Sequence, residues 1–454
     1  MTKIAYPSRR GLANLDSGRY IDLEEEISNL PAYDPSKCPK GLIDLSGAVN
    51  KLMRDVMEEK IDSFAAQYAF GQAIDYGPVM GPPSESTGLS KAVARFVNHH
   101  FKPATAVKST EILVTNGASS MIDLVAFNLC DRGEGIMVLT PTYMMFKHDL
   151  CARTGIEFIG VSASVDDQFS ARYAPQLVKV LENAIVESQR NKILVRALLI
   201  CNPCNPVGRC YSKTTLTYLA QLCGRHSMHL IADEIYAMSC FASSSPPGLD
   251  EFSSVLSLPA DPGNNVLAEN IHCIYGASKD FGAGGLRLGF FITRNELVWK
   301  VCRRLALFTW VTCFSTAYFE HFLSDESAIA GYLGLYQERL RARYVQTTDL
   351  LRKHGIPFVP ANSGIFLLVK LTRWLEFFNS SNPEKSAEEQ LCRYLAYSGG
   401  VFISMGELSH CEVPGWFRLT YTAYNTDVVL LAVDRLARSL AILEGLRTAD
   451  GLFS

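Results

Sequence analysis

The sequence predicts an α/β fold in which a large domain with a mostly parallel sheet is joined to a smaller α+β domain. Three observations support this prediction. The chain has 454 residues, which is enough for two or three domains. From about residue 88 to 290, short apolar runs alternate with amphipathic segments, a pattern typical of βαβ units. Beyond residue 290 helical patterns dominate, and only short apolar runs return.

The composition is that of an ordinary globular protein, with 48% hydrophobic and 20% charged residues. The net charge of -3 gives no basic field for nucleic acid or an anionic membrane, so we expect small-molecule chemistry. No apolar segment follows the basic N-terminal residues, and no run of 18 apolar residues occurs, so we expect neither secretion nor a membrane span. The 13 cysteines are scattered singly, which favours a reduced, cytoplasmic enzyme.

The predicted elements follow from these patterns in chain order. Residues 1–60 are polar and proline-punctuated and predict an arm followed by a short helix. Next come helices over 90–100, 119–129 and 175–189, and strands over 112–114, 136–139, 157–161, 197–200, 229–232 and 271–275. Residues 241–270, rich in Ser, Pro and Gly, predict a surface loop. Helices over 295–355 and strands over 365–369 and 416–419 predict the smaller domain.

Polar clusters follow several of these strands. Ligands of open parallel sheets bind at the carboxyl ends of the strands, so we expect these clusters to converge. Lys279 follows one strand and precedes a glycine-rich loop that contains Arg287. A lysine amine forms a Schiff base with an aldehyde cofactor, and an arginine clamps a phosphate. Taken alone, a surface lysine and a structural arginine explain this short pattern as well.

Two other strand ends carry an acid and an amide. Asp233 closes the run over 229–232, and Tyr236 lies three residues beyond it. A buried aspartate needs a partner, and a protonated pyridine nitrogen suits it; a cap on a following helix is the alternative. The Asn-Pro-Cys-Asn-Pro loop over 202–206 is rigid and presents the Asn205 amide. Its Cys201–Cys204 pair has no second CxxC, so we expect no metal.

The segment over 115–120, Thr-Asn-Gly-Ala-Ser-Ser, joins a strand to a helix. Free N–H groups at such a helix start bind anions, although a simple capping turn is the alternative. The order of the four strand-end motifs, with Arg287 behind them, is more specific than any one of them. With these motifs, the sequence resembles fold-type I pyridoxal-phosphate enzymes of the class I/II aminotransferase family, and within it 1-aminocyclopropane-1-carboxylate (ACC) synthases and their relatives. The resemblance runs from about Gly41 to Leu436.

This resemblance implies the finer architecture and the partners. It implies an aminotransferase-like α/β/α sandwich around a mostly parallel seven-stranded sheet. Residues 1–60 would form an arm and part of the small domain, 61–310 the large pyridoxal-phosphate domain, and 311–454 the C-terminal small domain. Tyr76 would reach the phosphate of the neighbouring subunit, which implies a homodimer with shared active sites.

The resemblance also implies a role for each matching residue. Lys279 would carry pyridoxal 5'-phosphate and act as the base at the substrate Cα, while Asp233 would hold the pyridinium proton and Tyr143 would stack on the ring. Asn205 and Tyr236 would bind the phenolic oxygen, and Ala118, Ser119, Ser278 and Arg287 would hold the phosphate. Arg418 would clamp the substrate carboxylate, with Ala48, Tyr143 and Asn205 beside it; a buried structural arginine is the alternative.

Three departures from the family pattern bear on the chemistry. Gly276 replaces a usual phosphate-binding serine, so one hydrogen bond to the phosphate is missing. Val49 stands where ACC synthases carry an acidic residue, which argues against a cationic sulfonium substrate. Met144 and Met145 replace a usual Pro-Gly pair and make the pocket rim more apolar.

The function implied by the resemblance is removal of the Cα proton of an amino acid, with transamination as the default outcome. The first alternative is a lyase, by β-elimination of carbon–sulfur bonds or by ACC-synthase-type γ-elimination. Related proteins of fungal secondary metabolism include carbon–sulfur lyases. The second alternative is an inactive relative with a binding role, which the retained Lys279, Asp233 and Arg287 argue against.

Overall fold

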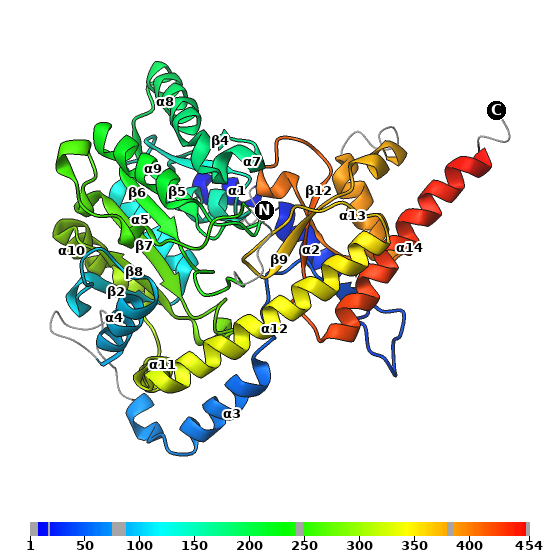
Figure 1. Cartoon of the computed structure of the whole chain (residues 1–454), viewed down its shortest axis with the longest axis horizontal. Helices are drawn as coiled ribbons and strands as arrows, with labels where there is room; N and C mark the ends of the chain where they lie inside the picture. The colour runs from blue at the N-terminus through cyan, green and yellow to red at the C-terminus, as the bar shows by residue number, and fades with distance from the viewer. Residues whose placement is uncertain (1–7, 17–18, 75–87, 242–247, 379–384, 451–454) are drawn as a thin grey trace, which may run out of the picture.

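The computed structural model describes residues 8–16, 19–74, 88–241, 248–378 and 385–450. A seven-stranded sheet forms the centre of the larger part (Figure 1). In spatial order its strands are β2 (Ile112–Thr115), β8 (Gly289–Thr293), β7 (Ile271–Gly276), β6 (His229–Asp233), β5 (Val195–Cys201), β3 (Gly135–Thr140) and β4 (Glu157–Ser162). All neighbours pair in parallel except β8, which is antiparallel to β2 and β7. The predicted α/β fold with a mostly parallel sheet is confirmed.

Helices lie on both sides of this sheet (Figure 1). They are α4 (Gly88–His100), α5 (Ala118–Leu129), α6 (Phe146–Cys151), α8 (Ala174–Arg190), α9 (Lys213–Arg225), α10 (Glu296–Leu305) and α11 (Cys313–Ser324). Strands β3 and β7 are buried along their whole length, as expected for a sheet covered on both faces. The strands predicted from apolar runs are confirmed. Burial explains the continuous runs of β3 and β7, whereas β4 is mostly exposed or half-buried.

The prediction that residues 241–270 form only a surface loop is wrong. This segment contains short 3-10 helices at Val255–Ser257, Pro262–Asn264 and Ala268–Asn270. Val255, Leu256 and Leu258 are buried. The segment packs beside β7, so burial of these few apolar side chains determines its structure although most of its residues are typical of loops.

The smaller part combines both ends of the described chain. Its three-stranded antiparallel sheet has the order β11 (Ser404–Met405), β12 (Trp416–Thr420) and β9 (Phe366–Lys370). A second pair joins β1 (Ile43–Asp44) in parallel to β10 (Val401–Phe402). The helices α13 (Ala387–Tyr397) and α14 (Thr426–Asp450) pack beside these strands. Residues before position 60 therefore pair with residues beyond position 400.

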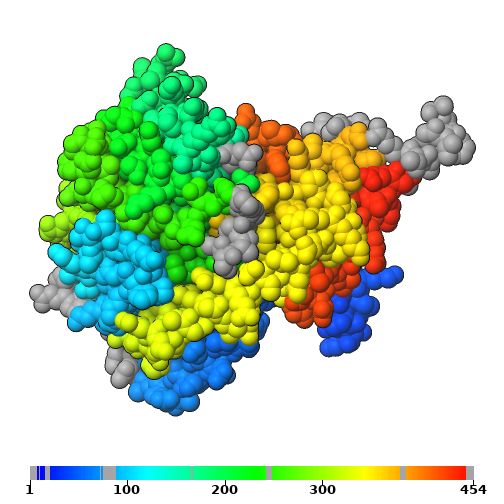
Figure 2. Space-filling view, in the orientation of Figure 1, coloured from blue at the N-terminus to red at the C-terminus, as the bar shows by residue number. Residues whose placement is uncertain are grey.

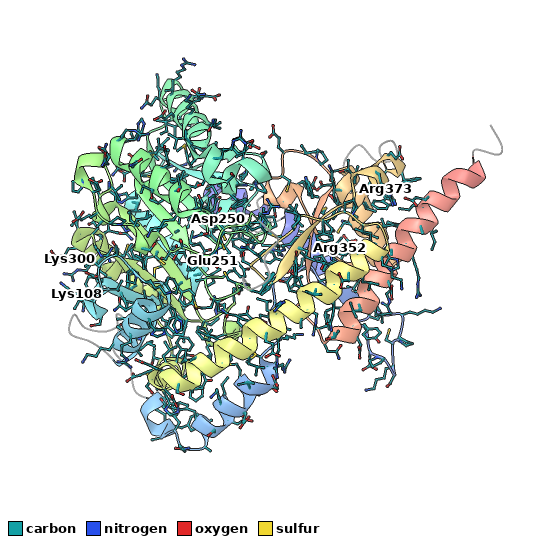
Figure 3. The ribbon with its side chains drawn as sticks, viewed as in Figure 1. Lys108, Asp250, Glu251, Lys300, Arg352 and Arg373 are labelled. Carbon is teal, nitrogen blue, oxygen red and sulfur yellow. The ribbon has the colours of Figure 1, made fainter. Side chains whose placement is uncertain are left out.

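A long helix, α12 (Glu326–Lys353), runs between the two parts, and the space-filling view shows it as the yellow surface between them (Figures 1 and 2). The helix α3 (Arg54–Ala65) packs against α11. Charged side chains such as Lys108, Lys300 and Arg373 lie at the periphery (Figure 3). Within the described ranges, no helix has both the length and the apolar character needed to cross a membrane.

Candidate active site

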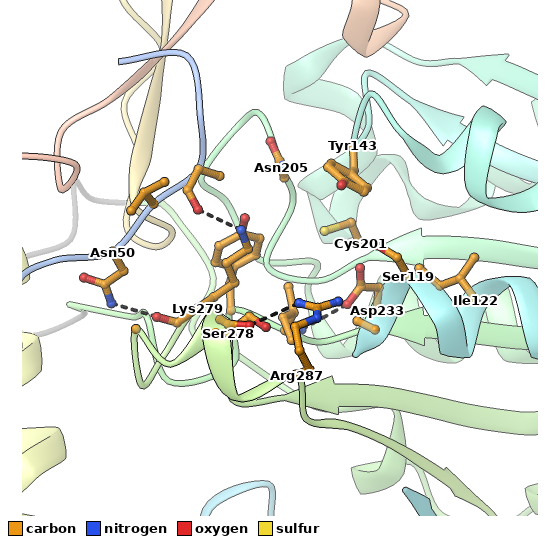
Figure 4. Close-up of a pocket in the computed structure, with 18 residues that line it drawn as sticks. Asn50, Ser119, Ile122, Tyr143, Cys201, Asn205, Asp233, Ser278, Lys279 and Arg287 are labelled. Carbon is orange, nitrogen blue, oxygen red and sulfur yellow. Dashed lines mark hydrogen bonds between the residues drawn. The ribbon is translucent and has the colours of Figure 1, made fainter. Parts of the chain in front are cut away.

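A cavity of about 460 Å³ lies at the carboxyl ends of β5, β6 and β7 (Figure 4). Its size falls within the usual range for a small-molecule site. Ten of the predicted site residues line it: Ala48, Ala118, Ser119, Tyr143, Asn205, Asp233, Tyr236, Ser278, Lys279 and Arg287. Arg418 lies next to the cavity and contacts Asn205. Tyr76 lies outside the described residues.

Lys279 extends into the cavity from the turn that follows β7 (Figure 4). Its Nζ donates a hydrogen bond of 2.7 Å to the carbonyl oxygen of Ala48, and Asn50 Nδ2 donates one of 2.7 Å to the carbonyl oxygen of Lys279. Burial, and then the charges of Arg418 and Arg287, outweigh the opposing effect of Asp233 and lower the pKa of Lys279 to about 8. A neutral, nucleophilic amine is therefore accessible near neutral pH.

Asp233 ends β6 and is only 5% exposed. Its Oδ1 accepts a hydrogen bond of 3.2 Å from the backbone N–H of Ile235. Burial raises its pKa to about 7, against the smaller lowering effects of that bond and of Lys279. The residues that follow form turns, so the alternative in which Asp233 caps a helix is wrong. A single hydrogen bond offsets little of the cost of burying a charged carboxylate, so a cationic group in the cavity would stabilise the ionised form of Asp233.

The opposite end of the cavity is suited to an anion. Helix α5 begins at Ala118, and its N-cap residue Gly117 supplies no side-chain cap, so the first N–H groups of the helix are available. Arg287 Nη2 lies so close to Gly117 that an added Cβ would be 2.5 Å away, and the φ of Gly117 is +125°. Ser119 and Ser278 add hydroxyl groups to the same lining. The arrangement offers backbone, hydroxyl and guanidinium donors to a phosphate.

Arg418 belongs to β12 of the smaller part and is 3% exposed. Its Nη1 donates a hydrogen bond of 3.0 Å to Asn205 Oδ1, and Nη2 bonds the carbonyl oxygen of Ser46. Its Nε is buried without a hydrogen-bond partner among the described residues. Because Asn205 itself faces the cavity, this contact joins the two parts of the molecule at the site.

The cavity also contains residues that were not predicted as site residues: Val49, Asn50, Ile122, Cys201, Ile235, Gly282, Gly284 and Gly285. Ile122 lies one helical turn beyond Ser119, so the helical period could have predicted that both residues line the same cavity. Cys201 is the last residue of β5, where the strand-end rule also applies. Asn50 acts through a hydrogen bond to a backbone 229 residues away, which no local pattern reveals.

Gly276 lies where β7 and β8 approach most closely. A Cβ at this position would lie 2.6 Å from the carbonyl oxygen of Leu288 and 3.1 Å from Ile235 Cδ1. Gly276 pairs with Gly289, whose own Cβ would meet Gly117 at 2.5 Å. A side chain at position 276 is therefore excluded by the backbone.

The Cys201–Cys204 pair makes no common site. Cys201 Sγ donates to the carbonyl oxygen of Pro203 at 3.2 Å, and Cys204 Sγ to that of Pro141 at 3.6 Å. Over the ranges that the structure covers, no group of three or more His, Cys, Asp or Glu side chains is placed to hold a metal ion.

Comparison with known proteins gives one consistent family. The family model for aminotransferase class I and II matches residues 42–436. The 1-aminocyclopropane-1-carboxylate synthase 7 of Arabidopsis thaliana is 29% identical over 89% of this chain and 88% of its own length. The probable aminotransferase sirI of Leptosphaeria maculans is 29% identical over 88% of this chain and 91% of its own length.

Solved structures share the fold. An aromatic aminotransferase from Pyrococcus horikoshii superposes with a TM-score of 0.72 at 19% identity, covering 89% of this chain and 96% of its own. An aspartate aminotransferase variant from Thermus thermophilus gives a TM-score of 0.71 at 21% identity, covering 96% of this chain and all of its own.

Proposed function

The chain belongs to the class I and II aminotransferase family, and on this basis we propose that it binds pyridoxal phosphate and removes the Cα proton of an amino-acid substrate. It is an enzyme of the transferase or lyase type. The observation that carries the proposal is that Lys279, Asp233 and Arg287 line one cavity.

The residues present fit this cofactor. Among the described residues, no cationic side chain forms an ion pair with the carboxylate of Asp233, which suits a protonated ring nitrogen. The uncapped start of α5, together with Ser278 and Arg287, suits the phosphate. Tyr143 lies on the cavity wall and would stack on the ring, while Asn205 and Tyr236 would bind its phenolic oxygen. Bound there, pyridoxal phosphate supplies a sink for the electrons released when Cα loses its proton.

Lys279 Nζ moves the proton in this proposal. Its pKa of about 8 allows it to accept a proton from Cα and to return it nearby. Arg418 binds the substrate carboxylate and orients the Cα–H bond toward Lys279, with Asn205 holding the guanidinium in place. Its unpaired Nε gives the guanidinium a further donor for that carboxylate.

Transamination is the proposed outcome, because returning the proton requires no group beyond Lys279. The lyase alternative is kept because several relatives are ACC synthases. Among the described residues that line the cavity, Asp233 at its base is the one acid, and Val49 is apolar. A cationic sulfonium side chain finds no carboxylate there, so elimination from a neutral cysteine conjugate is the favoured lyase reaction.

We further propose a homodimer located in the cytoplasm. None of the 13 cysteines, all of which lie in the described ranges, forms a disulfide, which fits a reducing compartment. Phe70 is 56% exposed and Ile74 is 86% exposed, just before Tyr76 in the chain, which fits a surface covered by a second copy. Mixing Tyr76→Ala and Lys279→Ala subunits tests this. Recovery of activity in the mixture supports shared sites, and no recovery contradicts them.

The test of the enzymatic proposal is a visible absorption spectrum of wild type and Lys279→Ala with pyridoxal phosphate. A band present in wild type and absent in the variant is expected. Amino acids and cysteine conjugates are then supplied without a keto acid, and ammonia is assayed. A spectral change without ammonia indicates transamination, whereas ammonia with pyruvate or a thiol indicates the lyase. Absence of a band in wild type would refute the proposal.

A further inference from the structure

Asp280 directly follows Lys279 and is completely buried, but its carboxylate faces away from the cavity lining. Three donors surround it. Ser239 Oγ donates to Oδ1 at 2.5 Å, while the Met238 backbone N–H and the Tyr275 hydroxyl each donate to Oδ2 at 2.9 Å. All three hydrogen bonds are buried, so losing one of them would leave a buried polar group unsatisfied.

Two of the three donors, Met238 and Ser239, come from the segment that carries Tyr236, and the third, Tyr275, belongs to β7. Ser239 N–H donates to the carbonyl oxygen of Tyr236 at 2.9 Å, so the turn from Tyr236 to Ser239 is closed on itself. Asp280 bonds the far end of this turn twice, through Met238 and Ser239. The turn bearing Lys279 and the turn bearing Tyr236 are therefore joined by one carboxylate.

The same carboxylate is linked to the helix that runs between the two parts of the molecule. The hydroxyl oxygen of Tyr336, on α12, forms a hydrogen bond of 2.7 Å with Ser239 Oγ. Tyr332, one turn earlier, donates a bond of 3.5 Å to the carbonyl oxygen of Asp280, and Gln337 Nε2 bonds the carbonyl oxygen of Met238 at 3.3 Å. Three segments thus meet at Asp280.

We propose that Asp280 is a positioning residue that fixes the distance between Lys279 Nζ and the Tyr236 hydroxyl across the cavity. The inference rests on the proposed function, in which Lys279 moves the proton and Tyr236 binds the cofactor. A displacement of either group by a fraction of an ångström lowers the rate without removing any reacting atom.

A second buried acid provides a matched control. Glu234 is also completely buried and accepts hydrogen bonds from Ser254 Oγ at 2.6 Å and from Val255 N–H at 2.8 Å. Burial raises the pKa of Glu234 and that of Asp280 alike to about 7. A third partner, Cys273 Sγ of β7, donates to Glu234 Oε2 at 3.4 Å, and none of these three partners lies in the turn that bears Lys279. The two acids have similar burial but bind different segments.

The test compares Ser239→Ala, Asp280→Asn and Glu234→Gln with wild type. Ser239→Ala removes one donor while leaving the carboxylate two others, so this variant is expected to fold even if Asp280→Asn does not. Three physical quantities are measured: the melting temperature, the visible band of the pyridoxal-phosphate complex, and the rate at which an amine-reactive ester labels Lys279 in the cofactor-free protein, followed by mass spectrometry. In addition, kcat and KM are measured with an amino acid or cysteine conjugate on which the wild type is active.

We expect Ser239→Ala and Asp280→Asn to shift the visible band, to change Lys279 labelling and to lower kcat about tenfold with little change in KM. Glu234→Gln is expected to lower the melting temperature and leave the other readouts as in wild type. Equal changes in the Asp280 and Glu234 variants, or changes in melting temperature alone, would overturn the inference.

The labelling experiment separates this inference from the proposed function. If wild type forms no Lys279-dependent visible band, the proposed function fails, yet labelling of Lys279 still reports whether Asp280 places its amine. A labelling rate that differs between Asp280→Asn and Glu234→Gln supports the placement, and an identical rate contradicts it.

Discussion

At the scale of single residues, the site depends on charged groups held away from water. Burial lowers the pKa of Lys279 to about 8 and raises that of Asp233 to about 7, so the two pKa values become similar. Neither shift arises from a close ion pair, because burial is the largest cause of both. The burial of these two charged groups therefore has an electrostatic cost, which the cationic ring and anionic phosphate of the proposed cofactor would reduce.

This cost predicts a pH dependence for Asp233→Asn in the cofactor-free protein. The folded-state pKa of Asp233 lies above its ordinary value of 3.8, so ionisation destabilises the fold as the pH rises from 3.8 to about 7. Asparagine has no such cost. The variant's unfolding free energy, measured by urea titration, should therefore rise relative to wild type across that interval and level off above it. A difference independent of pH would contradict the assigned burial effect.

At the scale of elements, the part of the site proposed to hold the phosphate lies where β7, β8 and α5 come together. Gly276, Gly289 and Gly117 lie at this meeting point, and an added Cβ on any of them would clash. The missing hydroxyl at position 276 is thus a consequence of how tightly the two strands and the helix start approach.

Gly276→Ser is accordingly expected to destabilise the protein rather than to restore a hydrogen bond to the phosphate. The new Cβ, 2.6 Å from the carbonyl oxygen of Leu288, should cost about 1–3 kcal/mol of unfolding free energy. Affinity for pyridoxal phosphate should not increase. Gly331→Ser in α12, where an added Cβ meets nothing within 4 Å, is the control and should not be destabilised. Tighter cofactor binding with unchanged stability in Gly276→Ser would contradict this explanation.

The strands and the meeting of strand-end motifs were predictable, because burial makes apolar runs continuous and parallel strands end at one edge. The hydrogen-bond partners of the buried polar groups could not be predicted from the sequence. Arg418 and Asn205 are 213 residues apart, and Asp280 meets Ser239 only because two turns lie side by side. Apolar residues such as Leu256 in a Ser- and Pro-rich stretch were also missed, since their burial depends on the sheet beneath them.

At the scale of the whole molecule, the site lies between the large sheet and the smaller part. Arg418 on β12 reaches Asn205 on the loop after β5, and Ser46 follows β1 on the same smaller part. The guanidinium proposed to bind the substrate carboxylate therefore also joins the two parts of the molecule.

Arg418→Lys is expected to raise KM for the amino acid at least about tenfold, because lysine cannot bind a carboxylate in the bidentate manner of arginine. The visible band of the bound cofactor should be unchanged. Arg343→Lys is the control: Arg343 is buried and bonds the carbonyl oxygens of Tyr421 and Tyr424, so its loss should lower stability without changing KM. Equal KM values for wild type and Arg418→Lys would remove Arg418 from the substrate site.

In the proposed function, Lys279 holds pyridoxal phosphate. The most direct test is to treat the protein and cofactor with borohydride, digest it, and locate the reduced pyridoxyl group by mass spectrometry. We expect the group on the peptide that contains Lys279, and its loss in Lys279→Ala. A group attached elsewhere, or no attachment in wild type, would contradict the account.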